Sequence, residues 1–174
     1  MVYSKVVDQD AKDIIEFCNE TVLLDKLKDK TFLVTGASGM VGSYFVYTLM
    51  KLNELYGANV QIKCVVRNEK RLDEYIKAHP NVEVIIQDII DEIKVDGPVD
   101  YIVHAASPAS PKIMSEHPVE TNFANTIGTA NTLKLAIDME KCHFFDPETQ
   151  LCVTVPFYVR PVKEEASEEE VVEE

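Results

Sequence analysis

The residues whose types and spacing point most directly to chemistry are the glycines of TGASGMVG at positions 35–42. Gly36 permits a tight turn, Gly39 lets the backbone approach a pyrophosphate, and Gly42 lets a helix pack closely on a sheet. Free N–H groups at the start of the following helix, together with the positive end of its dipole, favour a phosphate anion. The segment predicts dinucleotide binding, and the alternative is a tight turn without a ligand.

The elements that must position this loop follow from the hydrophobic pattern. Short apolar runs predict strands at residues 31–36, 60–66, 82–87 and 99–105. Helical patterns occupy residues 8–27, 43–56, 68–79 and a stretch that starts near Pro118. The last helix is expected to carry one apolar face, made of Phe123, Ile127, Ala130, Leu133 and Ile137. Alternating strands and helices predict an α/β fold, a Rossmann-like parallel sheet with flanking helices and ligand at the carboxyl ends of its strands.

The chain is expected to divide into four parts. These are a helical extension (1–29), a Rossmann dinucleotide-binding domain (30–139), an atypical extended segment (140–163) and a disordered acidic tail (164–174). The tail holds seven glutamates, so it carries about half of the formal net charge of −13. The α/β alternation ends near Met139, and we therefore expect a domain truncated relative to a full doubly wound fold.

Composition limits the function classes. The acidic balance argues against nonspecific nucleic-acid binding, because a phosphate backbone would be repelled. No apolar run approaches the roughly 18–20 residues of a membrane span, and MVYSKVVDQD lacks the apolar core of a signal peptide. We expect a cytoplasmic protein without membrane contact and with reduced cysteines. A metal site at Cys142, His143 and Cys152 is considered and set aside, because the ligand spacing is poor.

Several ordered motifs resemble one known family. TFLVTGASGMVGS is similar to the cofactor loop of the extended short-chain dehydrogenase/reductase superfamily, which includes nucleotide-sugar epimerases, dehydratases and decarboxylases. DYIVHAAS at 100–107 resembles that family's fourth strand. HAASPASP and PVETNFANTIGTANTLKLA resemble UDP-glucuronate decarboxylases and their dehydratase relatives. The resemblance implies a Rossmann fold, NAD or NADP as cofactor, and nucleotide-sugar chemistry of the lyase or isomerase type.

The resemblance also implies cofactor-binding residues. They are Gly36, Ser38, Gly39, Met40, Val41, Gly42, Arg67, Asn68, Asp88, Ile89, Ala105, Ala106 and Ser107. Asp88 and Ile89 would lie beside the adenine, and Ala105–Ser107 would border the nicotinamide. Arg67 stands where NAD-using members usually place a carboxylate, so it favours the 2′-phosphate of NADP. A surface arginine beside the adenine is the alternative.

The family's acid/base pair is a tyrosine with a lysine four residues later. Tyr158 and Lys163 are five apart and separated by Pro161, which excludes a shared helical turn. We therefore predict no catalytic residue and no metal in this chain, and a nucleotide-sugar enzyme-like protein that is catalytically incomplete. The alternatives are a noncatalytic dinucleotide-binding or assembly module and a truncated gene product. A nucleotide sugar is the expected further ligand, and homo-oligomerisation is left open.

Overall fold

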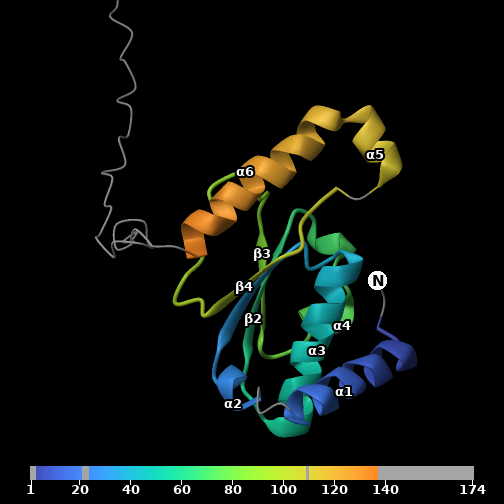
Figure 1. Cartoon of the computed structure of the whole chain (residues 1–174), viewed down its shortest axis with the longest axis vertical. Coiled ribbons are helices and arrows are strands. Elements are labelled where there is room, and N and C mark those ends of the chain that lie inside the picture. Colours follow the sequence, from blue (N-terminus) through green and yellow to red (C-terminus); the bar gives the residue numbers. More distant parts are fainter. Residues whose placement is uncertain (1–2, 21–23, 109, 137–174) are drawn as a thin grey trace, which may run out of the picture. The chain divides into compact units, whose positions relative to one another are not determined.

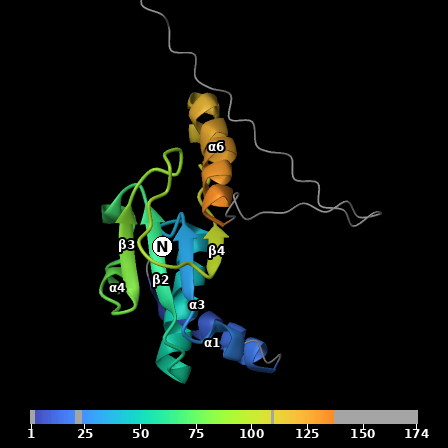
Figure 2. The same cartoon turned by 90° about the vertical axis from the view of Figure 1, so that its left-hand side faces the viewer.

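A four-stranded parallel sheet forms the centre of the computed structural model, which describes residues 3–20, 24–108 and 110–136. The strands are β1 (Thr31–Thr35), β2 (Gln61–Val66), β3 (Val82–Ile86) and β4 (Tyr101–His104). Their order in the sheet is β3-β2-β1-β4, and every pairing is parallel (Figures 1 and 2). The predicted α/β class and the Rossmann-like parallel sheet are therefore confirmed.

The sheet is covered on both faces, as the apolar runs of its strands require. Successive side chains of a strand point to opposite faces, so neighbours in β1 enter different cores. Val34 belongs to the larger core, which includes Val46 and Met50 of α3 (Met40–Tyr56). Leu33 belongs to the smaller core, with Ile89 and with Ala124 of α6 (Pro118–Ala136).

Helix α1 (Lys5–Glu20) packs on the outer side of α3. Its buried residues Val7, Ala11 and Ile15 are four positions apart, which places them on one helical face. The predicted helix over 8–27 is only partly correct. Two helices occupy this region, α1 and the short α2 (Leu24–Leu27), and residues 21–23 lie outside the described part of the chain.

The predicted single helix over 68–79 is wrong. A 3₁₀ turn, η1 (Glu69–Arg71), is followed by extended backbone and then by α4 (Glu74–Lys77). The Asp73 side chain explains the break, because its Oδ1 accepts from the N–H of Tyr75 at 3.0 Å and so starts a new helix. Its other oxygen accepts from the Tyr47 hydroxyl at 2.7 Å and from the Tyr3 N–H at 2.6 Å.

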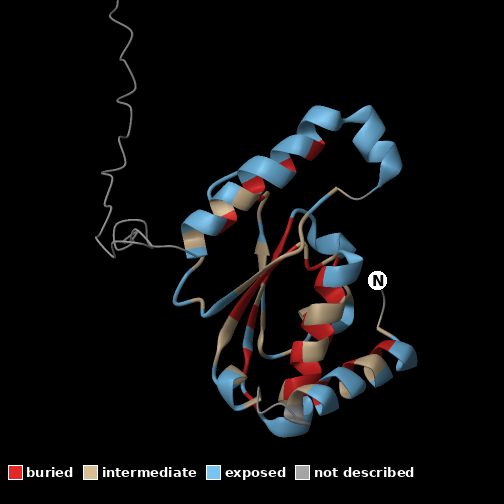
Figure 3. Cartoon of the chain, in the orientation of Figure 1, coloured by how far each residue is buried: buried red, intermediate tan, exposed pale blue. Residues whose placement is uncertain are grey.

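The last described helices follow β4. Helix α5 (Pro111–Glu116) was not predicted, whereas α6 starts at the expected Pro118. The expected apolar face is exposed at Phe123 (46%), Ile127 (41%) and Leu133 (52%) (Figure 3), and Ile137 lies outside the described residues. The buried positions of α6 are Thr121, Ala124, Gly128 and Thr132. Small residues face the sheet because α6 lies close to the segment that follows β3, where Ile89 contacts Gly128.

All the described residues lie in the first of the two units into which the chain divides, Met1–Met139. The extended segment expected at 140–163, the acidic tail at 164–174, Cys142, Cys152 and the Tyr158–Lys163 pair all lie outside the described residues. Among the described helices, none has the length and apolar character needed to cross a membrane.

Candidate functional site

The turn after β1 is shaped by Gly36. Its φ of +68° lies in the left-handed region, and its N–H donates to the Val65 carbonyl of β2 at 3.1 Å. A Cβ at this position would stand 2.7 Å from backbone atoms of Ala105 and Ala106. Glycine is therefore required both by the conformation and by the close approach of the chain that follows β4.

The other two glycines shape the start of α3. Gly39 precedes the first residue of the helix, and no side chain caps the N–H groups there. A Cβ on Gly42 would lie 2.3 Å from the Gly36 carbonyl oxygen, so this glycine allows contact between the helix and the loop. The sequence-based reason for Gly42, packing of the helix on the sheet, is thus replaced by packing on the loop itself. Uncapped N–H groups beside a glycine turn suit a phosphate anion.

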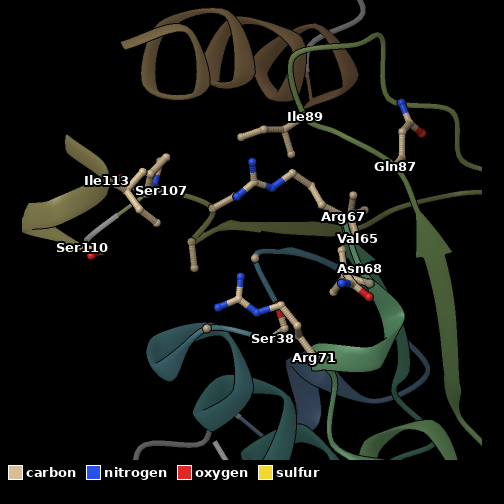
Figure 4. A pocket seen from close by; sticks show the side chains of 16 residues that line it. Ser38, Val65, Arg67, Asn68, Arg71, Gln87, Ile89, Ser107, Ser110 and Ile113 are labelled. Carbon is tan, nitrogen blue, oxygen red and sulfur yellow. The ribbon is translucent and has the colours of Figure 1, made fainter. Parts of the chain in front are cut away.

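A cleft of about 440 Å³ opens above this loop at the carboxyl ends of the strands (Figure 4). This volume is within the usual range for small-molecule sites. Nine of the thirteen predicted cofactor-binding residues line the cleft. They are Gly36, Ser38, Gly39, Arg67, Asn68, Ile89, Ala105, Ala106 and Ser107. The fold therefore brings together segments that are up to about 70 positions apart in the chain.

The remaining four nominated residues lie outside the lining. Met40 and Val41 are exposed in the first turn of α3, and Gly42 packs on the loop behind them. Asp88 follows β3, and its carboxylate lies 3.9 Å from the Arg67 guanidinium. At this distance the ion pair is loose, and the Arg67 side chain remains 62% exposed.

Sequence reasoning missed several lining residues. They are Val65, Val66, Arg71, Gln87, Pro108, Ser110 and Ile113. Ser110 and Ile113 belong to the unpredicted α5 region, and Arg71 was assigned to a continuous helix instead of a 3₁₀ turn. The position of Arg71, four residues after Arg67, was the available signal for a second cation at the same edge.

Helix α6 holds one wall of the cleft. The Asn131 amide donates to the carbonyls of Ile89, Ile90 and Asp91 at 2.9–3.1 Å. A Cβ on Gly128 would lie 2.5 Å from the Ile89 Cδ1, so the helix and the Ile89 side chain are in close contact. Asn131 and Gly128 are therefore positioning residues for the segment after β3.

His104 joins the sheet to α6. Its Nδ1 lies 2.8 Å from the Thr35 hydroxyl of β1, and its Nε2 lies 3.3 Å from the Thr129 hydroxyl of α6. Its Nδ1 also lies 3.1 Å from the Thr132 hydroxyl of α6, so three threonine hydroxyls surround the ring. Burial lowers the pKa of His104, which agrees with a neutral ring. These contacts assign His104 a structural role.

One tyrosine in the sequence has a lysine four residues later, and this pair is Tyr47 with Lys51. The structure places this pair on α3 outside the cleft lining. Burial and the hydrogen bond to Asp73 raise the pKa of Tyr47, opposite to the lowering that an acid/base tyrosine requires. The Lys51 ammonium lies 2.6 Å from the carboxylate of Asp8 and also contacts Glu54. Lys51 thus ties α1 to α3, Tyr47 binds Asp73 at the start of α4, and neither lines the cleft.

Comparisons with known proteins agree with this geometry. The model of the NAD dependent epimerase/dehydratase family matches residues 32–158. UDP-glucuronic acid decarboxylase 1 of Danio rerio is 38% identical over 108 residues, which cover 62% of this chain and 24% of that protein. UDP-glucuronic acid decarboxylase 6 of Arabidopsis thaliana is 39% identical over 104 residues, covering 60% of this chain and 29% of that protein. The chain thus spans about a quarter of the length of these relatives.

A solved structure is also similar. The X-ray structure of Pen from Bacillus thuringiensis superposes with a TM-score of 0.52 and 26% sequence identity, over 64% of this chain and 35% of that one. The resemblance that the sequence motifs indicate is therefore confirmed, both in sequence and in fold.

Proposed function

We propose, from the premise that this chain belongs to the NAD dependent epimerase/dehydratase family, that its described unit binds a nicotinamide dinucleotide in the cleft above the 36–42 loop. The observation that carries the proposal is the uncapped start of α3 beside a turn that only glycine can form. This cradle fits a pyrophosphate, because backbone N–H groups and the helix dipole both favour an anion there.

Different residues around the loop would contact different parts of the dinucleotide. Arg67, Asn68 and the segment Asp88–Ile89 lie toward the ends of β2 and β3, where an adenosine would sit. Ala105–Ser107 follow β4 and would border the nicotinamide. Val65 and Ile89 supply apolar walls that exclude water from the bound rings. When bound, the nicotinamide supplies the reversible oxidation of a substrate hydroxyl.

The substrate we propose is a nucleotide sugar, and UDP-glucuronate is the specific candidate. Both the Danio rerio and the Arabidopsis thaliana relative are named UDP-glucuronic acid decarboxylases. The segment that matches the family model, residues 32–158, includes the cofactor loop and the strand that would border the nicotinamide. We further propose that the 174-residue chain by itself binds the cofactor without completing the reaction. This part of the proposal is supported by the placement of Tyr47 and Lys51 outside the cleft.

Calorimetric titration of the purified chain tests the proposal. NAD and NADP are titrated separately, and UDP-glucuronate is then added to the saturated complex. We expect saturable binding of one dinucleotide per chain, which UDP-glucuronate does not displace. The absence of saturable binding for both dinucleotides would reject the cleft as a cofactor site.

A further inference from the structure

We propose that the cleft selects a dinucleotide with a phosphate on the 2′ position of its adenosine ribose, and that Arg71 determines this selectivity together with Arg67. The inference rests on the proposed dinucleotide function and assigns a ligand class to one end of the same cleft. Arg71 is the new element, since the sequence pattern pointed to Arg67 alone.

The charge of the cleft lining is the first observation. Two of its residues are arginines and none is a carboxylate, although the whole chain has a formal net charge of −13. Figure 4 shows both guanidinium groups extending into the cleft from the segment that follows β2. The carboxylate that commonly accepts from the 2′-hydroxyl of NAD has no counterpart in the lining, and a guanidinium can only donate. A phosphate monoester carries up to two charges and three acceptor oxygens, so it matches two guanidinium donors.

The backbone that carries Arg71 is held by local contacts. The N–H of Arg71 donates to the Asn68 carbonyl at 3.1 Å, and the Asn68 side chain accepts from the N–H of Lys70 at 3.0 Å. Leu72, the next residue, is buried in the larger core and anchors the turn. The 3₁₀ turn therefore returns the chain so that residues 67 and 71 line the same cleft.

The two guanidinium groups differ in their partners. Arg67 has the loose contact with Asp88 at 3.9 Å. Within the described residues, no carboxylate lies within 4.0 Å of the Arg71 guanidinium, which leaves it available to a ligand anion. Ser38, on the glycine loop, lines the cleft too and offers a hydroxyl donor. The positive charge of the cleft lining, the geometry of the turn and the available Arg71 guanidinium thus all favour binding of a second phosphate group, in addition to the pyrophosphate.

Binding to matched ligand pairs tests this inference. NADP and NAD are compared by calorimetry on the full chain, and adenosine 2′,5′-bisphosphate is compared with adenosine 5′-phosphate to isolate the 2′ group. We expect NADP to bind at least tenfold more tightly than NAD. Arg71→Gln should reduce this preference to less than threefold, because it weakens the binding of NADP more than that of NAD. Lys70→Gln is the matched control, because it removes the same charge from the adjacent exposed residue, which does not line the cleft.

The outcomes separate the inference from the function on which it rests. Equal affinities for NADP and NAD, or tighter NAD binding, would overturn the inference while the proposed dinucleotide function stands. An unchanged NADP preference in Arg71→Gln would remove Arg71 from the site. If neither dinucleotide binds the parent chain, the proposed function itself fails. Because Arg71 is exposed, its replacement does not disturb a buried contact, and thermal unfolding of each variant checks this.

Discussion

At the scale of single residues, Gly39 shows how a missing side chain can serve a site. Its φ of −81° is open to any residue, so the backbone conformation does not require glycine. What glycine supplies is space in the cleft lining and an unobstructed approach to the start of α3. A Cβ here would stand 3.2 Å from the Gly36 carbonyl oxygen, a tight but tolerable contact.

We therefore predict that Gly39→Val weakens dinucleotide binding at least tenfold, or about 1.4 kcal/mol. The branched side chain would keep the pyrophosphate away from the helix N–H groups. Ala78→Val places the same side chain on the exposed end of α4 and should leave binding unchanged. Calorimetric affinities measure the effect, and equal unfolding temperatures show that both variants fold. Parent-like affinity in folded Gly39→Val would place the pyrophosphate elsewhere.

At the scale of elements, His104 connects β4 to β1 and α6 through threonine hydroxyls. Burial lowers its pKa below the ordinary value of 6.5. As the pH falls, the unfolded chain therefore binds a proton at His104 at a higher pH than the folded protein does. The contribution of neutral His104 to the free energy of unfolding is fully present above about pH 6.5 and decreases as the pH falls below this value.

The expected consequence is a smaller acid sensitivity in a variant without this ring. Between pH 7.5 and 5.5, His104→Gln should lose less unfolding free energy than the parent, although it is less stable at pH 7.5. His117→Gln, which removes a histidine whose side chain is 60% exposed, is the control for the loss of a histidine ring. Urea unfolding at both pH values measures these differences. Parallel losses in the parent and His104→Gln would contradict a neutral buried ring.

The docking of α1 on α3 is a second feature at this scale. Ile15 is 2% exposed at the contact, whereas its neighbour Ile14 is 44% exposed. We predict that Ile15→Ala lowers the free energy of unfolding by about 2–5 kcal/mol, the range for a buried isoleucine. Ile14→Ala, the matched control, should change it by less than about 1 kcal/mol. Chemical denaturation measures both values, and equal effects would mean that α1 is not packed on α3 in solution.

At the scale of the whole molecule, we expect the chain to bind its cofactor without catalysing the reaction. A positioned proton-transfer group contributes about 10²–10⁴-fold to a reaction of this kind. The tyrosine of the one pair with suitable spacing is buried against Asp73. We predict that the 174-residue chain with its cofactor does not turn over UDP-glucuronate, as followed by product chromatography. Multiple turnover that Tyr158→Phe abolishes would show instead that the segment beyond the described unit supplies an active site.

The sequence by itself determined the parallel α/β arrangement and most of the cleft. The hydrophobic periodicities of strands and helices are local properties of the sequence, and the glycine spacing predicts where the loop turns. The carboxyl ends of parallel strands meet at one edge, so the order of strands and loops along the chain is enough to expect Ser38, Arg67 and Ala105 together. Nine of the thirteen nominated residues do line the cleft for this reason.

The tertiary structure alone decided the details that depend on contacts between distant segments. Asp73 starts α4 by accepting from the Tyr75 N–H, and Tyr3 and Tyr47 bind its other oxygen from segments distant in the chain. Arg71, in the 3₁₀ turn before it, lines the cleft. Helix α6 turns its small residues inward because Ile89 and the sheet lie too close for larger ones. Tyr47 and Lys51 have catalytic spacing, yet α1 and Asp73 bury them in a structural contact. Periodicity and spacing report on one element at a time, whereas these outcomes depend on which elements become neighbours.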